Sequence, residues 1–136
     1  MEAKISYAAG LFDGEGTVTL SRLHADDVFR APMVSLSSTS FELVQFMKDN
    51  FGGAIISHKT YQPHHRKQWS WRLVRRSALA FLEKITPYIV EEEKKRRVHL
   101  ILDEYLSVTP RNGKYSPVLF QRKSDFEKRF FHPSDP

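Results

Sequence analysis

The sequence has no cysteine and only 6 glycines in 136 residues. Without cysteine it can form neither a disulfide framework nor a zinc site built on thiolates. No apolar run approaches the roughly 18 residues needed to cross a bilayer, and no basic leader with an apolar core marks a signal peptide. We therefore expect an intracellular, soluble protein, in the cytoplasm or nucleoid or in an organelle, with no membrane partner.

Acidic residues are absent between Asp49 and Glu83, although the chain holds 16 of them. This interval instead contains six basic residues and three histidines, namely Lys59, Arg66, Lys67, Arg72, Arg75, Arg76, His58, His64 and His65. The histidines lack the spaced second pair of ligands of a zinc site. With a net charge of +5, such a surface attracts a polyanion, because each neutralised phosphate releases condensed counterions. A solvated basic face without a ligand is the alternative.

The most informative stretch, AAGLFDGEG, spans residues 8–16. It begins as an apolar helix and ends with two carboxylates two positions apart, Asp13 and Glu15. Gly10 and Gly14 lie on one helical face, where each disfavours the helix by roughly 1 kcal/mol relative to alanine. Close packing of a second helix against this face would compensate, and two copies of this helix would bring two Glu15 side chains together.

This stretch resembles the nine-residue signature of the LAGLIDADG homing endonucleases, with Ala8 for the leading leucine, Phe12 for the isoleucine, Gly14 for the second alanine and Glu15 for the final aspartate. In that family the final acidic residue binds a catalytic divalent metal, and single-motif chains are usually homodimers. The resemblance implies Mg²⁺ (or Mn²⁺) held by Glu15 and the Gly14 carbonyl, since carboxylates suit hard cations. It also implies a dimer interface that includes Ala9, Gly10, Asp13 and Gly14.

Hydrophobic periodicity predicts an α+β fold made of one domain, residues 1–136. Strands are expected over 17–24, 31–38, 54–61 and 68–74, and helices over 3–13, 41–51, 78–85 and 87–107. The order αββαββα is also that of the family, so the resemblance covers a core of about residues 3–107. A C-terminal tail, 108–136, is expected to end with a helix over 117–131.

Local signals place the helix ends. Thr39 or Ser40 can cap the helix over 41–51, and Glu42 lies where a capping box with Thr39 requires it. Ser77 can cap the next helix, and Pro87 is expected to open the long one.

The four-stranded antiparallel sheet is expected to expose a polar face. That face and the hairpin beside it would carry Thr17, Thr19, Ser21, Ser35, Ser37, Ser57, Lys59, Tyr61, Arg66, Lys67, Gln68, Ser70 and Arg72. Such groups suit hydrogen bonds to base edges in the major groove, and the sheet has this function in the family. A merely solvated face is also normal for an antiparallel sheet.

The register of the fourth strand decides which of its residues face DNA. We expect Trp69, Trp71 and Leu73 to point at the core, because two buried tryptophans stabilise more than two exposed ones. A gapless comparison with the family through residues 86–88 would instead place both tryptophans on the DNA side.

The family adds a polar residue after the second strand and a lysine early in the last long helix. The first position falls on Ser37 or Ser38, of which Ser38 is the candidate. Counted from Pro87, the position of the family's lysine falls on Glu92. Lys94 or Lys95 could take the role of that lysine only if the helix register is shifted. The catalytic candidates are therefore Glu15, Asp13, Ser38 and Lys94, with Asp13 expected mainly to bond backbone groups at the helix end.

The run from Glu91 to Arg97 also has a simpler interpretation. Three pairs stand at favourable i,i+4 spacing, namely Glu91–Lys95, Glu92–Arg96 and Glu93–Arg97. A solvated helix face that pairs with itself would need no catalytic lysine.

The resemblance implies a sequence-specific double-strand DNA endonuclease that takes part in intron homing and cuts a long, partly palindromic site at a homodimer interface. Two alternatives use the same fold without this activity. One is an RNA maturase that assists intron splicing, and the other is a DNA-binding regulator that has lost cleavage. Retention of Glu15 favours the nuclease, whereas Glu92 at the expected lysine position favours the alternatives.

Overall fold

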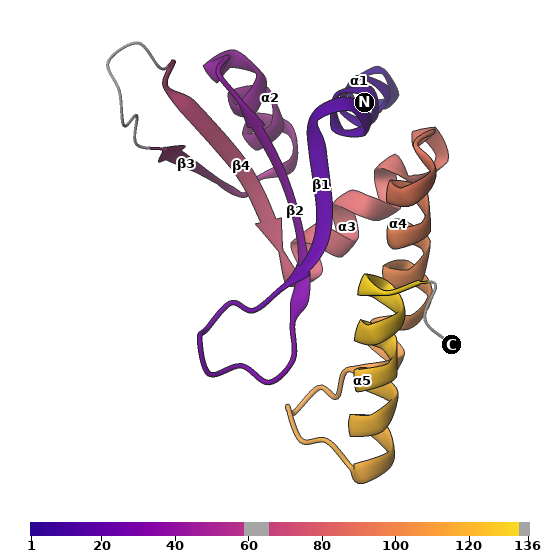
Figure 1. The fold of residues 1–136 in the computed structure, drawn as a ribbon. Coiled ribbons are helices and arrows are strands. Elements are labelled where there is room, and N and C mark those ends of the chain that lie inside the picture. The colour runs from indigo at the N-terminus through magenta and orange to yellow at the C-terminus, as the bar shows by residue number, and fades with distance from the viewer. Residues whose placement is uncertain (59–65, 134–136) are drawn as a thin grey trace.

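In the computed structural model, residues 1–58 and 66–133 are described. Two strand pairs alternate with helices in the order α1 (Glu2–Glu15), β1 (Gly16–Ser21), β2 (Ala31–Ser38), α2 (Phe41–Phe51), β3 (Ala54–His58), β4 (Gln68–Val74), α3 (Arg75–Ile85), α4 (Glu92–Glu104) and α5 (Pro117–Phe131). Short 3-10 turns, η1 (Thr86–Tyr88) and η2 (Leu106–Val108), flank α4. The strands form one antiparallel sheet, β1-β2-β4-β3 (Figure 1). The predicted α+β class is confirmed.

The core lies between the sheet and the helices α1, α2 and α3. Phe81 of α3 is at its centre, with ring centroids of Phe12, Phe51 and Trp71 at 5.4, 5.0 and 5.1 Å from its own. The indole N–H of Trp71 donates to the Gly52 carbonyl at 2.7 Å, so its only polar atom is satisfied. Because the helices bury this side of the sheet, the opposite side is left free.

The predicted register of β4 is confirmed. Trp71 and Leu73 are buried on the helix side, with 0% and 4% of their surfaces exposed. Trp69, on the same side near the strand's start, is half-buried and packs edge-on against Phe41 with ring centroids 5.3 Å apart. Gln68, Ser70 and Arg72 therefore alternate onto the free face.

The predicted register of β3 is wrong. Ser57 pairs with Trp69 and Ile55 with Trp71, so both lie on the helix side of the sheet. Ile56, which pairs with Ser70, and His58, which pairs with Gln68, take the free face instead. The two consecutive isoleucines fit either alternation, and the pairing of Ile55 beside buried Trp71 decides between them. The expected positions Lys59 and Tyr61 lie outside the described residues.

Several predicted helix ends are corrected. Helix α1 continues through Gly14 to Glu15, where a turn was expected, and the first strand ends at Ser21. The backbone N-cap of α2 is Ser40, whose hydroxyl donates to Glu42 at 2.9 Å, and the Thr39 capping box does not form. Helix α3 begins at Arg75, before Ser77.

The last long helix begins at Glu92, five residues after Pro87, which lies in η1. Glu91 caps it, because its carboxylate accepts from the backbone N–H of Glu93 and Lys94 at 3.2 and 2.6 Å. The preceding turn therefore ends at an acidic cap, and the cap fixes which residues form the first turn of α4.

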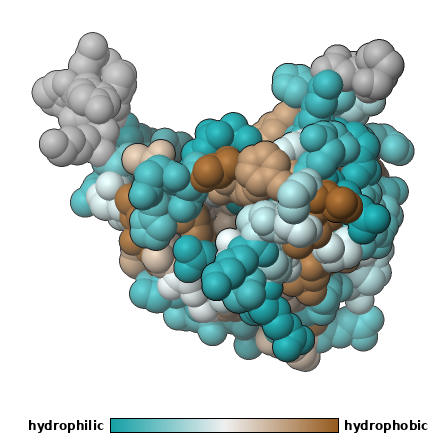
Figure 2. Space-filling view, turned by 90° about the horizontal axis from the view of Figure 1, so that it is seen from below, coloured by the Kyte–Doolittle hydropathy of each residue, from teal (hydrophilic) through white to brown (hydrophobic). Residues whose placement is uncertain are grey.

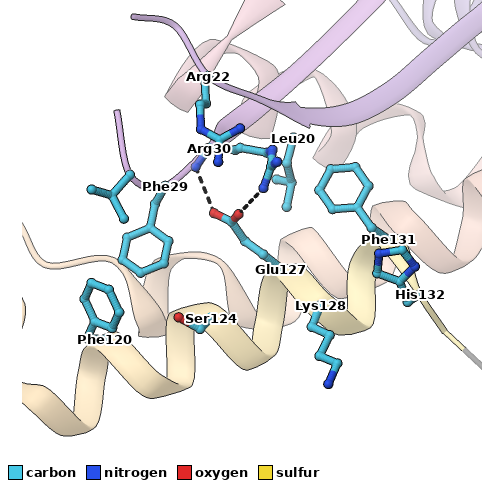
Figure 3. Close-up of a pocket in the computed structure, with 11 residues that line it drawn as sticks. Leu20, Arg22, Phe29, Arg30, Phe120, Ser124, Glu127, Lys128, Phe131 and His132 are labelled. Carbon is cyan, nitrogen blue, oxygen red and sulfur yellow. Dashed lines mark hydrogen bonds and ion pairs between the residues drawn. The ribbon is translucent and has the colours of Figure 1, made fainter. Parts of the chain in front are cut away.

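The predicted C-terminal helix is confirmed as α5, which packs beside the connection between β1 and β2. Glu127 of α5 accepts from the Arg30 backbone N–H at 2.8 Å and from its guanidinium at 2.7 Å (Figure 3). These groups lie in a cavity of about 700 Å³. Seen from below, hydrophilic side chains dominate this end of the molecule, with hydrophobic patches between them (Figure 2). No helix in the described part of the chain is long and apolar enough to cross a membrane.

Candidate nucleic-acid interface and active site

The end of α1 is held in place by Asp13. Its carboxylate accepts the backbone N–H groups of Val90 and Glu91 at 2.8 and 3.1 Å. These bonds join the motif helix to the segment that leads into α4. The expectation that Asp13 bonds backbone groups is confirmed, and its two oxygens are already engaged.

Lys94 reaches the same helix end. Its ammonium donates to the Asp13 carbonyl at 2.5 Å, and Lys94 is half-buried there. The negative end of a helix dipole attracts such a cation. Glu92 is exposed and forms no ion pair in the described ranges 1–58 and 66–133. Of the two lysines considered from the sequence, Lys94 is thus the one that the structure brings to the residue two positions before Glu15.

The charged run is partly self-paired. Glu93 forms ion pairs with Arg96 at 2.8 Å and with Arg97 at 3.1 Å, so one of the three predicted i,i+4 pairs is present. Hydrogen bonding from Arg96 lowers the pKa of Glu93 to about 2. Arg97 also donates to the Val18 carbonyl at 2.9 Å, which ties α4 to β1. The sequence gave no signal for this contact, since it depends on how α4 lies against the sheet.

A cavity of about 330 Å³ opens where the motif helix meets the sheet. Glu91, Glu93, Lys94 and Arg97 line it from α4 and its cap, and Gly16 to Val18 line it from β1. Both glutamates are already bonded, Glu91 to backbone N–H groups and Glu93 to arginines. Lys94, which is bonded to the Asp13 carbonyl, brings positive charge to the C-terminal end of α1.

Glu15 and Gly14 are exposed at the C-terminal end of α1. The last carbonyls of a helix lack intrahelical partners, so Gly14 can offer an oxygen beside the Glu15 carboxylate. These oxygens fit a hard divalent cation. No cluster of three or more His, Asp or Glu side chains suited to a metal occurs among the described residues.

One face of α1 carries the two glycines, and among the described residues no other segment packs directly on them. A Cβ added at Gly10 or Gly14 would meet no atom within 4 Å, so neither glycine is needed for packing inside the subunit. Tyr7, on the same side of the helix, is 53% exposed, although its ring packs edge-on against Phe46 of α2 with the centroids 5.0 Å apart. Ala9 corrects the prediction, because it is fully buried in the core and its side chain cannot belong to an exposed interface.

The free face of the sheet presents most of the predicted polar residues. Strand pairing and alternation place Thr17, Thr19, Ser21, Ser35, Ser37, Gln68, Ser70 and Arg72 on it. Arg66 and Lys67 are exposed just before β4. Hydroxyls, an amide and the Arg72 guanidinium thus share one surface, and groups of these kinds can hydrogen-bond to base edges.

A chain of hydrogen bonds crosses this face. The Ser37 and Ser70 hydroxyls are 2.5 Å apart, and the His58 Nε2 atom is 2.6 Å from the Ser70 hydroxyl. His58 was predicted only as a member of the basic hairpin. Its place on the free face follows from the β3 register, which the sequence leaves ambiguous.

Ser37 replaces Ser38 as the polar residue near the site. Ser37 follows Leu36, which pairs with Gly16, so it lies next to the end of the motif helix and on the free face. Ser38 pairs with Trp69 on the helix side, and its hydroxyl accepts the Ser40 backbone N–H at 2.9 Å. Its role is to hold the turn into α2.

No family model and no curated protein matches the chain, but its fold is similar to that of solved homing endonucleases. The homing endonuclease I-CvuI, in complex with its target in the presence of calcium, matches with a TM-score of 0.74 and 16% identity over 99% of this chain and 84% of that one. The archaeal intron-encoded homing endonuclease I-Vdi141I, complexed with DNA, matches with a TM-score of 0.69 and 19% identity. The match covers 98% of this chain and 85% of that one. The LAGLIDADG homing endonuclease I-GzeII, in complex with its DNA target, matches with a TM-score of 0.63 and 14% identity. The match covers 96% of this chain and 49% of that one.

These likenesses define the class of protein by its architecture. The chain has the fold of the LAGLIDADG homing endonucleases, which confirms the resemblance of residues 8–16 at the level of the fold. It matches I-CvuI and I-Vdi141I over most of their lengths and I-GzeII over about half.

Proposed function

We propose that this chain is one subunit of a homodimeric, metal-dependent endonuclease that cuts both strands of a specific DNA duplex. The observation that carries the proposal is the end of α1. There an exposed carboxylate, Glu15, lies two residues from the carbonyl to which the Lys94 ammonium is bonded at 2.5 Å.

Phosphodiester hydrolysis needs an activated water and neutralisation of the charge that develops on the phosphate. Mg²⁺ or Mn²⁺ supplies both when bound, by lowering the pKa of a water ligand and polarising the phosphoryl oxygens. Glu15 and the Gly14 carbonyl of each subunit would hold the ions between the two motif helices. Lys94 would stabilise charge on the phosphate, and the Ser37 hydroxyl would orient water from the neighbouring strand.

Two further observations support a DNA duplex as substrate. The free face of the sheet gathers hydroxyls, an amide and the Arg72 guanidinium beside the proposed centre. Solved proteins with this fold are DNA complexes of homing endonucleases. A partly palindromic site would match the two-fold symmetry of a dimer, and cleavage of an intronless allele would serve homing of an intron.

We test the proposal with plasmid DNA that carries the sequence flanking the gene. The wild-type protein should linearise this plasmid in Mg²⁺ and leave it intact in EDTA. Glu15→Gln should abolish cleavage and keep the affinity for DNA, because it removes a charge and leaves the sheet unchanged. Glu83→Gln, an exposed glutamate on α3, is the matched control and should cut normally.

Other outcomes contradict the nuclease. Binding of the duplex without cutting by the wild type in Mg²⁺ would indicate a regulator. Preferential binding to the folded intron RNA would indicate a maturase. Undiminished cutting by Glu15→Gln would remove Glu15 from the mechanism.

A further inference from the structure

A second basic feature lies where β4 turns into α3, and the proposed active site does not use it. Arg75, Arg76 and Arg111 line one cavity of about 480 Å³. Arg75 and Arg76 come from the first turn of α3, and Arg111 comes from the connection between α4 and α5. Tyr105 and Thr109 contribute to the wall, and no carboxylate does. We call this the arginine cavity.

None of the three arginines forms an ion pair with a carboxylate of residues 1–58 or 66–133. Asp26 and Asp27 share a neighbouring cavity with Arg75 and Arg111. The Asp27 carboxylate accepts the backbone N–H of His24 at 3.0 Å. The three guanidinium groups are exposed and carry like charge, so an anion that enters the cavity is attracted by all of them.

Lys123 adds to the same positive charge from behind. It is 99% buried, and its ammonium donates to the Thr109 hydroxyl at 2.5 Å, in the wall of the arginine cavity. Glu127 lowers the net charge there but is held by Arg30 at 2.7 Å. The electrostatic balance around the cavity remains positive.

The backbone at Arg75 supports a function for its side chain. Its φ is +55°, in the left-handed region, where a bulky residue is strained by roughly 1–3 kcal/mol and glycine is not. This turn lets two consecutive arginines line one cavity. An arginine at a position that favours glycine indicates that the guanidinium itself is required.

The arginine cavity continues the cationic surface of the sheet. Val74, immediately before Arg75, pairs with Met33, while Trp71 pairs with Leu36, the partner of Gly16. The cavity thus lies about three residues, or roughly 10 Å, further along the sheet than the end of the motif helix. Arg72, on the free face, lies between the two.

We propose that the arginine cavity binds a backbone phosphate of the DNA duplex, in the outer part of each half-site and away from the cleaved bond. Guanidinium groups suit this ligand because they bind phosphate oxygens in pairs. The inference rests on the proposed function, since it requires a duplex on the free face of the sheet. It adds a contact that fixes the duplex without reading its sequence.

The test is the salt dependence of DNA binding by the double variant Arg76→Gln/Arg111→Gln. Affinity for a long duplex of arbitrary sequence is measured in EDTA over a range of NaCl concentrations. Loss of one phosphate contact in each half-site, two for the dimer, should lower the slope of log K against log salt by about 2 and weaken binding roughly 30-fold at physiological salt. Arg75 is kept, because its replacement would also change the backbone strain.

The matched control is Lys48→Gln/Arg122→Gln, which removes the same charge from exposed positions on α2 and α5. Its slope should equal that of the wild type, and thermal unfolding checks that both variants are folded. Equal slopes for the two double variants would overturn the inference and leave the proposed nuclease intact. Absence of duplex binding by the wild type would overturn both.

A titration with inorganic phosphate separates the two sources of the anion. Phosphate binding that the Arg76→Gln/Arg111→Gln variant loses, together with an unchanged DNA slope, would show a site for a free anion. That outcome would overturn the assignment to the DNA backbone.

Discussion

Asp13 and Glu15 are two carboxylates in one helical turn, and their surroundings give them different tasks. Asp13 accepts two backbone N–H groups from the segment before α4, so its oxygens are used to hold the two helices together. Glu15 is exposed and forms no hydrogen bond or ion pair with its side chain among the described residues. The sequence places both acids at the helix end, and only the packing of α4 shows which one is free to bind a ligand.

Lys94 provides a prediction at the residue scale. Lys94→Gln should reduce cleavage by about 100-fold or more, because it removes a positive charge beside the phosphate. Affinity for the duplex in Ca²⁺ should stay within a few-fold of the wild type. Glu92→Gln, which changes the residue at the position expected from the family, should cut at the wild-type rate. A fast Lys94→Gln enzyme, or a slow Glu92→Gln enzyme, would show that the register was assigned wrongly.

Lys123 provides a prediction about pH. Burial lowers the pKa of its ammonium from 10.5 to about 8, although Glu127 opposes the shift. The unfolded chain therefore binds the proton more tightly, so the free energy of unfolding should rise with pH between about 8 and 10.5. Relative to Lys123→Met, the wild type should gain at most on the order of 3 kcal/mol across this window. Chemical denaturation at a series of pH values measures it, and parallel curves would contradict the prediction.

At the scale of elements, β3 and β4 differ in how far the sequence determines which face of the sheet each residue takes. In β4 the tryptophans and Leu73 alternate with polar residues, and one face is clearly apolar. In β3, Ile55 and Ile56 are adjacent, and the short edge strand offers no alternation to choose between them. Pairing with β4 settles the choice, because only one arrangement puts Ile55 beside buried Trp71.

The corrected β3 register predicts that His58, and not Ser57, faces the DNA. His58→Ala should weaken binding of the specific duplex by roughly 5- to 100-fold, the effect of losing a base-edge hydrogen bond of about 1–3 kcal/mol. It would also break the hydrogen bond to Ser70. Ser57→Ala, on the opposite side of the same strand, should change affinity by less than about twofold. Affinities of both variants measured side by side decide the matter, and the reverse ranking would restore the original register.

Helix α4 illustrates a boundary that the sequence misplaced. Pro87 is a good first residue for a helix, yet it lies in the short turn η1, and α4 begins five residues later. The Glu91 side chain can cap α4 because Asp13 accepts its backbone N–H and fixes the turn. A contact between residues 78 positions apart thus determines where the helix starts.

At the scale of the whole molecule, the exposed face of α1 is the feature that one chain leaves unused. Space above Gly10 and Gly14 is open within the subunit, and Tyr7 is largely exposed beside them. Close helix approach through small residues would bury this face and bring two Glu15 carboxylates together. The homodimer is a prediction that depends on two such helix faces packing against each other.

Gly10→Arg tests the dimer. An arginine has room at this position within the subunit, so the thermal unfolding of the fold itself should be little changed. In a dimer it would collide with the partner helix, and sedimentation should show a monomer that does not cut DNA. Ala80→Arg, at an exposed position on α3, should remain a dimer and cut. A wild-type protein that stays monomeric with DNA present would contradict the proposal at once.

The sequence by itself determined the α+β class, the motif helix, β4 and α5, because hydrophobic periodicity and turn residues act over short distances along the chain. It also placed Glu15 and Gly14 near the end of the motif helix and Arg72 on the free face of the sheet, since spacing can be read directly. Only the tertiary structure decided the partners of Lys94, the place of Ser37 rather than Ser38, and the face of His58. These depend on contacts between segments far apart in the chain, and a shift of one residue in register reverses which side chain meets the ligand.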